Sequence, residues 1–365
     1  MSLLATPFHA RAVEANRCNA WENRQGYTLA SHYGSVAEEA VAARFGAVLA
    51  DVSWRWQATF TGSAVEAFVA RAFSRNGAAL APGMSLEVLW LNDAGAVRGQ
   101  GTLWRLAPER FVLLSAQEDR DWLFYAANLF GVSSSDQSCD GALALIGPTA
   151  RKILSAAGLA ADPAQGGQVS LNWRGLDVTL CRVGLGYELW CDADSALIVW
   201  DRLMAVGKAF ALLPAGQAAL DVLEGENGLL RPGRDFTPSR DGFGVFPRPQ
   251  DLGLCSLVDR AHIFNGKAGF LAAGRDTVLS GLLFSAAPAT AVLTHLGVPI
   301  GKILSTRYSP ALQQTFGFGI LTGSWPSGEV AAGSLPCRVV GLPFLPLALS
   351  PDKSDSATER ANSPV

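Results

Sequence analysis

The pattern of the chain changes at Thr277, and this change constrains the fold more than any other feature. From there on, short apolar runs bounded by glycine and proline predict strands, and no segment has the spacing of a helix. The expected strands are 278–284, 300–303, 316–321 and 337–340. Short strands joined by turns bury their apolar faces by closing on one another, so this region predicts a separate all-β module.

The first two thirds of the chain mix helices and strands irregularly. Ser35 and Ser63 each begin an S-x-x-E capping box, which predicts helices over 35–43 and 63–73. The sequence 92–95 (Asn-Asp-Ala-Gly) predicts a hairpin turn, because these residues adopt the backbone angles that join antiparallel strands. The other expected elements are one or two strands within 48–61, strands 86–91, 96–106, 110–114, 142–146, 178–182 and 187–191, and helices 149–157, 195–210 and 217–230.

Composition excludes several classes of protein. The chain has 365 residues, of which 49% are hydrophobic and 17% charged, so it is globular and long enough for two or three subdomains. Its 29 Lys and Arg against 32 Asp and Glu give a net charge of −3, which leaves no basic footprint for nucleic acid. The last stretch, 351–365, is polar and predicts a disordered tail.

Several further features are missing from the sequence. Its 6 cysteines form no C-x-x-C pair and its 4 histidines form no ligand-spaced group, so we expect neither a metal site nor a redox dithiol. The glycine-rich loops that hold nucleotide phosphates are absent. There is no apolar window of about 18 residues and no signal-peptide pattern, so we expect a cytoplasmic protein without a membrane partner. The sequence gives no indication of oligomeric state.

A series of motifs follows in an order that is typical of one family. The motifs are Asn92-Asp93-Ala94-Gly95-Ala96-Val97, Gly186-Tyr187-Glu188-Leu189-Trp190, Pro214-Ala215-Gly216, Glu226-Asn227-Gly228, Gly233-Arg234-Asp235, Asp251-Leu252-Gly253-Leu254, Phe264-Asn265-Gly266-Lys267, and Gly301-Lys302-Ile303 leading to Tyr308-Ser309-Pro310. Over roughly residues 25 to 347, the chain resembles the folate-binding glycine-cleavage T-protein (aminomethyltransferase) family. The segments 186–190 and 207–214 most resemble its tetrahydrofolate-dependent demethylase branch, which removes methyl groups from methoxyaromatic acids.

The resemblance implies an α+β fold with three subdomains in a cloverleaf. Two mixed α/β subdomains with antiparallel sheets and a C-terminal β-barrel would surround a central channel that holds tetrahydrofolate. On this basis we expect residues 1–250 to form a folate-binding region of two interleaved subdomains, one of them 46–136. Residues 251–350 would form the barrel.

Three residues are expected to bind the cofactor. In the family, the glutamate at the position of Glu188 holds the pterin, and a carboxylate can accept both adjacent N–H donors of the pyrimidinone edge. Trp190 could stack on a flat ligand, and Arg234, with Arg231, could pair with the glutamyl carboxylates of folate. The alternatives are an outward strand carboxylate, a core tryptophan and solvated arginines.

Two residues are expected to act in the reaction. Gln100 stands where the glycine-cleavage enzymes carry an aspartate, and an amide can hydrogen-bond a substrate but cannot serve as a general base. Gln100 or Tyr187 would assist the departing atom while tetrahydrofolate N5 takes a methyl group from an O-, S- or N-methylated small molecule. Aminomethyl transfer and a non-catalytic folate-binding module are the alternatives.

Two further positions depart from the family pattern. Residues 182–186 are about four residues shorter than the family's usual run, which removes its folate-contacting tyrosine. Leu220 stands where the glycine-cleavage proteins have arginine. Both departures remove expected folate contacts while Glu188 keeps one, and Arg231 and Arg234 could compensate by pairing with the glutamyl carboxylates.

Overall fold

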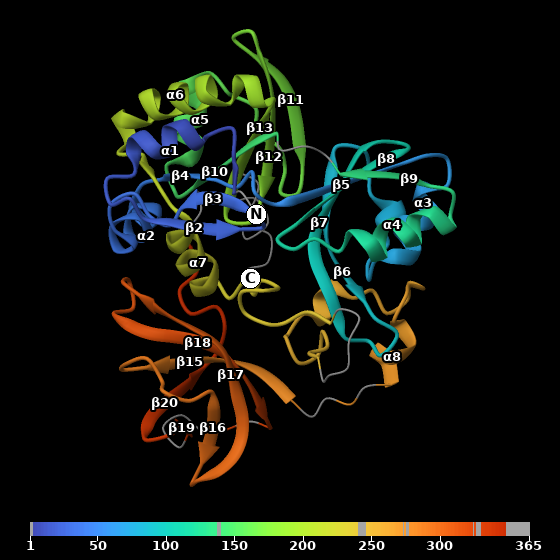
Figure 1. Cartoon of the computed structure of the whole chain (residues 1–365), viewed down its shortest axis with the longest axis vertical. Coiled ribbons are helices and arrows are strands. Elements are labelled where there is room, and N and C mark those ends of the chain that lie inside the picture. Colours follow the sequence, from blue (N-terminus) through green and yellow to red (C-terminus); the bar gives the residue numbers. More distant parts are fainter. Residues whose placement is uncertain are drawn as a thin grey trace, which may run out of the picture.

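Three subdomains, each built on its own sheet, make up the structure (Figure 1). It is a computed structural model that describes residues 3–136, 140–239, 246–272, 274, 277–323, 325 and 330–347. The predicted α+β class and the three-subdomain arrangement with a C-terminal barrel are confirmed. The predicted tail 351–365 lies outside the described residues.

The first subdomain contains a six-stranded sheet with helices on both faces (Figure 1). In sheet order the strands are β11 (Gln168–Trp173), β12 (Leu176–Val183), β13 (Gly186–Cys191), β10 (Gly141–Ile146), β4 (Val48–Asp51) and β14 (Leu213–Pro214). The helices are α1 (His9–Ala15), α2 (Val36–Phe45), α5 (Ala150–Ala157), α6 (Ala196–Gly207) and α7 (Gln217–Glu226). A small sheet of β1 (Leu4–Ala5), β3 (Tyr27–Ala30) and β2 (Trp21–Arg24) lies beside them.

Side-chain alternation divides this sheet into two apolar faces. Leu143 and Leu189 pack with α1, α5 and α6, whereas Ala144 and Ile146 pack with α2 and α7. Successive residues of a strand point to opposite faces, so each residue of β13 is committed to one side. Even-numbered residues of β13 therefore face the α7 side.

The second subdomain is a five-stranded sheet covered by two helices. Its strands, in sheet order, are β6 (Met84–Leu91), β7 (Val97–Ala107), β8 (Arg110–Ser115), β5 (Trp56–Thr61) and β9 (Ser133–Asp136), and its helices are α3 (Val65–Ala72) and α4 (Arg120–Leu129). The predicted hairpin turn at 92–95 is confirmed: Gly95 has a φ of +77°, and the Ala96 N–H donates to the Asn92 side chain at 2.9 Å. Phe60, Phe68 and Leu113 form the centre of its core.

The third subdomain is a closed six-stranded barrel, as the all-β pattern predicts. Its strands, in order around the barrel, are β15 (Thr277–Phe284), β18 (Gln314–Thr322), β17 (Val298–Ser309), β16 (Val292–His295), β19 (Val330–Ala332) and β20 (Leu335–Val340). The segment before it, including α8 (Lys267–Ala272), packs against the second subdomain, where Phe270 joins Leu91 and Val97 in one core cluster. The chain thus returns to the second subdomain before it forms the barrel.

Some predicted boundaries are confirmed and others are wrong. Ser35 caps α2 by accepting the Glu38 N–H at 3.1 Å, but Ser63 caps nothing, because α3 begins at Val65 with Ala64 at the cap position. The helix predicted over 217–230 ends at Glu226, since the chain turns at Gly228, which has a φ of +76°. In the part of the chain that the structure describes, no helix is both long and apolar enough to span a membrane.

Candidate functional site

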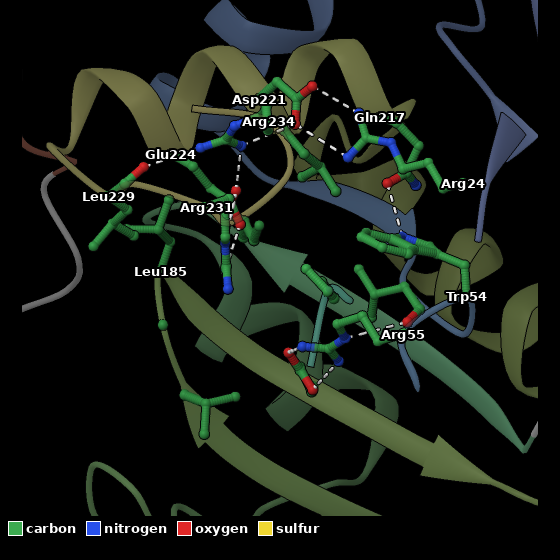
Figure 2. Close-up of a pocket in the computed structure, with 18 of the residues that line it drawn as sticks. Arg24, Trp54, Arg55, Leu185, Gln217, Asp221, Glu224, Leu229, Arg231 and Arg234 are labelled. Carbon is green, nitrogen blue, oxygen red and sulfur yellow. Dashed lines mark hydrogen bonds and ion pairs between the residues drawn. The ribbon is translucent and has the colours of Figure 1, made fainter. Parts of the chain in front are cut away.

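A cavity of about 350 Å³ lies where the β12–β13 hairpin, α7 and the segment 229–234 of the first subdomain meet residues 116–117 of the second (Figure 2). Val52, Ile146, Leu185 and Leu220 give it apolar walls. Its charged lining consists of Arg24, Arg55, Glu188, Asp221, Glu224, Arg231 and Arg234. Four arginines against three carboxylates leave the cavity with one excess positive charge.

The hairpin that forms one wall is tight. Val183 pairs with Gly186, so Gly184 and Leu185 alone make the turn, and Gly184 has a φ of +53° that favours glycine. The two-residue turn explains how residues 182–186 join the two strands although this segment is shorter than in the family pattern. It brings Leu185 to the cavity wall.

Glu188 lies in the cavity and is only 7% exposed. Its Oε1 and Oε2 accept from Nη1 and Nη2 of Arg55 at 2.9 and 2.7 Å. Oε2 also accepts from the indole N–H of Trp190 at 3.0 Å. The residue predicted to hold the pterin is therefore at the cavity, and it has an arginine partner that the sequence analysis missed.

Arg55 follows β4 in the chain and reaches Glu188 across 133 residues of sequence. Its Nε donates to the Val52 carbonyl at 3.3 Å. The only local signal for this residue is a basic side chain between Trp54 and Trp56. No spacing rule connects position 55 with position 188, because their contact depends on tertiary packing.

Tyr187 faces away from Glu188. It packs with Leu189 in the core on the α5–α6 side, and its hydroxyl donates to Asp162 Oδ1 at 2.7 Å. Burial, together with this hydrogen bond, raises the pKa of Tyr187. Its predicted role in the reaction stays a prediction, and the structure places its hydroxyl on a carboxylate rather than beside Glu188.

Trp190 lies between two cavities. Its indole N–H donates to Glu188 in the first, while the residue lines a second cavity of about 450 Å³ together with Gln57 and Asn172. Its ring packs edge-on against Trp104, with centroids 5.2 Å apart. Trp190 thus supports the carboxylate of Glu188 and does not itself line the first cavity.

Gln100 is on β7 opposite Leu89 and is not part of the lining of the first cavity. Its Oε1 is buried, and no hydrogen-bond donor within the described ranges reaches it. The second subdomain instead contributes Ala116 and Gln117 to the cavity. Of the two predicted reaction residues, the structure therefore places Tyr187 at the cavity of Glu188 but not Gln100.

Arg234 is fully engaged by protein groups. Its Nη1 donates to Asp221 at 2.9 Å and to Glu224 at 2.7 Å, and its Nη2 donates to Asp235 at 2.7 Å and to the Leu229 carbonyl at 3.0 Å. Burial alone would lower the pKa of Arg234, but these carboxylates raise it. Arg234 is a permanent cation that organises the loop after α7.

Arg231, by contrast, keeps a donor for the cavity. Its Nε and Nη2 donate to Glu224 at 3.1 and 2.6 Å, and among the described residues its Nη1 contacts no acceptor. Burial would raise the pKa of Glu224, but the charges of Arg231 and Arg234 outweigh it and hold that pKa well below its ordinary value. In Figure 2 Arg231 reaches from the α7 side toward the wall where Arg55 lies.

The ion pairs continue in both directions along the molecule. Asp221 also accepts from Arg24, whose guanidinium lies 5.3 Å from the ring centroid of Trp54. At the other end, Asp235 accepts from Ser305 at 2.7 Å and from Arg307, both on β17 of the barrel. Alternating charges thus connect the small N-terminal sheet, α7 and the barrel.

The cavity can bind a ligand of mixed polarity. Glu188 offers carboxylate oxygens to it, Arg231 Nη1 offers a donor, and Val52, Ile146, Leu185 and Leu220 offer apolar contacts. All three carboxylates of the lining pair with arginine. Within the described ranges, no three His, Cys, Asp or Glu side chains are grouped so as to hold a metal ion.

Comparison with known proteins gives consistent matches. The family described as the GCVT N-terminal domain matches residues 8–245. The chain is 30% identical to an aminomethyltransferase of Frankia alni over 85% of this chain and 89% of that protein. It is 26% identical to an aminomethyltransferase of Thermotoga neapolitana, over 83% of this chain and 86% of that protein. The glycine cleavage system aminomethyltransferase T of Bartonella henselae shares its fold, with a TM-score of 0.82, 24% identity and coverage of 95% and 99%.

Proposed function

The chain belongs to the glycine-cleavage T-protein family of tetrahydrofolate-dependent one-carbon transferases, and from this we propose that it transfers a one-carbon unit in the cavity beside Glu188. The observation that carries the proposal is the position of Glu188. It is a buried, arginine-paired carboxylate in a cavity where, among the described residues, Arg231 Nη1 contacts no acceptor. Folate carries partners for both groups, because its pterin has N–H donors and its glutamyl part has carboxylates.

The residues of the cavity fit tetrahydrofolate. When bound, the cofactor supplies the N5 nitrogen that exchanges the one-carbon unit. Glu188 would accept N–H groups of its pterin, and Arg231 Nη1 would donate to a carboxylate of its glutamyl part. Ile146, Leu185 and Leu220 would exclude water from the space between, which strengthens every polar contact there.

Aminomethyl transfer is the finer proposal that the comparisons favour. The relatives reported above are named aminomethyltransferases, and the chain aligns with most of their length. In this reaction the carbon of the aminomethyl group would be transferred to the folate as a methylene group, and the product would be methylene-tetrahydrofolate.

Methyl transfer is the second candidate, and a specific observation favours it. The described cavity lining contains no carboxylate without an arginine partner, and an amide, Gln100, stands where the glycine-cleavage enzymes carry an aspartate. A displacement that depends on alignment rather than on a strong base suits such a site.

Product analysis separates these candidates. The protein is incubated with tetrahydrofolate and a panel of aminomethyl donors, methoxybenzoates, sulfonium compounds and methylated amines, and the folate product is identified by mass spectrometry. Methylene-tetrahydrofolate supports aminomethyl transfer, and methyl-tetrahydrofolate supports methyl transfer. Folate binding without any product would instead indicate a binding module.

Thermal stability tests the location of the site. A ligand at about 100 times its Kd stabilises the fold by about 2.7 kcal/mol, which raises Tm visibly. Glu188→Gln should abolish this rise, because an amide offers only one acceptor oxygen. The control is Asp119→Asn, which alters a carboxylate with the same kinds of partner, Arg98 and Trp90, away from the cavity. A full rise in Tm for Glu188→Gln would place the pterin elsewhere.

A further inference from the structure

Arg55 occupies the acceptor edge of Glu188. Two of its nitrogens donate to the two carboxylate oxygens, and Trp190 donates to one of them as well. An ionised carboxylate offers about four lone-pair positions, so these three hydrogen bonds leave one position free. A ligand that places one N–H on each oxygen therefore does not find both oxygens available.

The donor edge of Arg55 is chemically the same as that of a pterin. The 2-amino-pyrimidinone edge carries a ring N–H and an amino group on one carbon, which is the donor arrangement of two guanidinium nitrogens. Both edges are planar and place two parallel N–H bonds on a carboxylate. The two edges cannot occupy the same oxygens at the same time.

Of the two partners, Arg55 is the one that can leave. Glu188 sits within β13, paired on both sides by β10 and β12, and its carboxylate is also fixed by Trp190. Apart from Glu188, the described contacts of the Arg55 guanidinium consist of one hydrogen bond, from Nε to the Val52 carbonyl at 3.3 Å. Its side chain borders the cavity and is 15% exposed.

We propose that Arg55 is an internal competitor for the pterin position and thereby determines which ligands bind and how tightly. A ligand must displace the two N–H donors of Arg55 from Glu188 and replace them with its own. Ligands that lack two adjacent donors are therefore rejected. This inference rests on the proposed function, since it takes the pterin of a folate as the ligand at Glu188.

The second subdomain contains the same arrangement away from the cavity. Asp119 accepts from Nε and Nη2 of Arg98 at 3.0 and 2.9 Å and from the indole N–H of Trp90 at 2.8 Å. This carboxylate, arginine and tryptophan match Glu188, Arg55 and Trp190 in chemistry. Because neither Arg98 nor Asp119 lines the cavity, Arg98→Met is the matched control for Arg55→Met.

The test measures binding of 5-formyltetrahydrofolate, an air-stable reduced folate, by isothermal titration calorimetry. We expect Arg55→Met to lower the Kd by about tenfold or more, because the competing charge-assisted hydrogen bonds are removed. Arg98→Met should leave the Kd unchanged. Low-millimolar methylguanidinium should compete with the folate in Arg55→Met but not in the wild type, where the tethered guanidinium already holds the position.

The possible outcomes distinguish this inference from the proposed function. Wild-type binding with an equal or higher Kd in Arg55→Met overturns the role of Arg55 and leaves the folate site in place. Failure of the wild type and of every Arg55 variant to bind overturns the proposed function and this inference with it. If Arg55→Met does not fold, Arg55→Lys serves instead. Lysine replaces the two parallel guanidinium donors by a single ammonium group, so it competes less well for Glu188 than arginine does. The Kd of Arg55→Lys for 5-formyltetrahydrofolate should therefore lie below that of the wild type, by a smaller factor than for Arg55→Met.

Discussion

Tyr187 and Glu188 are neighbours in β13, yet their side chains serve opposite sides of the sheet. The Tyr187 hydroxyl donates to Asp162 at 2.7 Å, whereas the Glu188 carboxylate pairs with Arg55 in the cavity. Because side chains alternate along a strand, the two side chains leave the sheet on opposite faces, although Tyr187 also borders the cavity. This relationship separates the two residues that the sequence motif places side by side.

Tyr187→Phe should therefore affect stability more than ligand binding. The change leaves one Asp162 oxygen without its donor, and we expect the free energy of unfolding to fall by about 0.5–1.5 kcal/mol. The Kd for 5-formyltetrahydrofolate should not change. Urea unfolding and calorimetry measure the two quantities; a loss of kcat of about a hundredfold, with stable protein, would instead support the predicted role of Tyr187 in the reaction.

Gln100→Leu should be neutral or stabilising in urea unfolding. The Oε1 of Gln100 is buried without a donor within the described part of the chain, and such an unpaired acceptor costs about 1–3 kcal/mol. A leucine of similar size removes that cost. If the variant keeps its stability but loses turnover, Gln100 contacts the substrate. Gln100→Asp places a carboxylate at the same point, and improved aminomethyl transfer by it would favour that candidate over methyl transfer.

Glu224→Gln should lower stability at neutral pH and much less in acid. The pKa of Glu224 is held below its ordinary value of 4.5 in the folded protein, so the unfolded chain binds the proton first as the pH falls. The stabilisation from Glu224 is therefore fully present above about pH 5 and is lost as the pH falls toward the folded pKa. Urea midpoints measured between pH 7 and pH 3 should show the two proteins converging; a constant difference would contradict this.

Ser35→Ala and Ser63→Ala form a matched pair for helix capping. Ser35 accepts the Glu38 N–H, so its replacement should cost about 1 kcal/mol of unfolding free energy. Ser63 begins the same sequence pattern but makes no cap, and its replacement should change stability by less than about 0.5 kcal/mol. Equal losses in urea unfolding would mean that Ser63 caps α3 in solution.

Local pattern was sufficient for much of the fold. Four of the six barrel strands, the turn at Asn92–Gly95 and α2 were predictable from neighbours in sequence, whereas the short strands β16 and β19 were not predicted. The errors arose where tertiary packing decides the outcome. The sequence pattern did not predict the helix α4. It predicted α7 to be four residues too long, because the helical spacing of apolar residues continues past the turn at Gly228.

The candidate site was predictable only in part. The motif that contains Glu188 identified a residue that does lie in a cavity. Arg55 pairs with Glu188 across 133 residues of sequence, and Arg24 pairs with Asp221 across 197. The periodic patterns of helices and strands describe only neighbouring residues, so they do not predict such long-range pairs. Arg234 belongs to a motif, but only the packed structure shows that its donors are already bound and that Arg231 faces the ligand space.

The pairing of Asp235 with both Arg234 and Arg307 connects the barrel to the loop that lines the site. Asp235 is 1% exposed, and its two arginines come from the loop after α7 and from β17. A shortened protein that stopped before Thr277 would leave this buried anion short of one counter-charge and would free the loop that carries Arg231. The C-terminal quarter of the chain, from Thr277 on, thus holds the Arg231 loop in place from outside the cavity, and a protein without it should have a cavity of different shape.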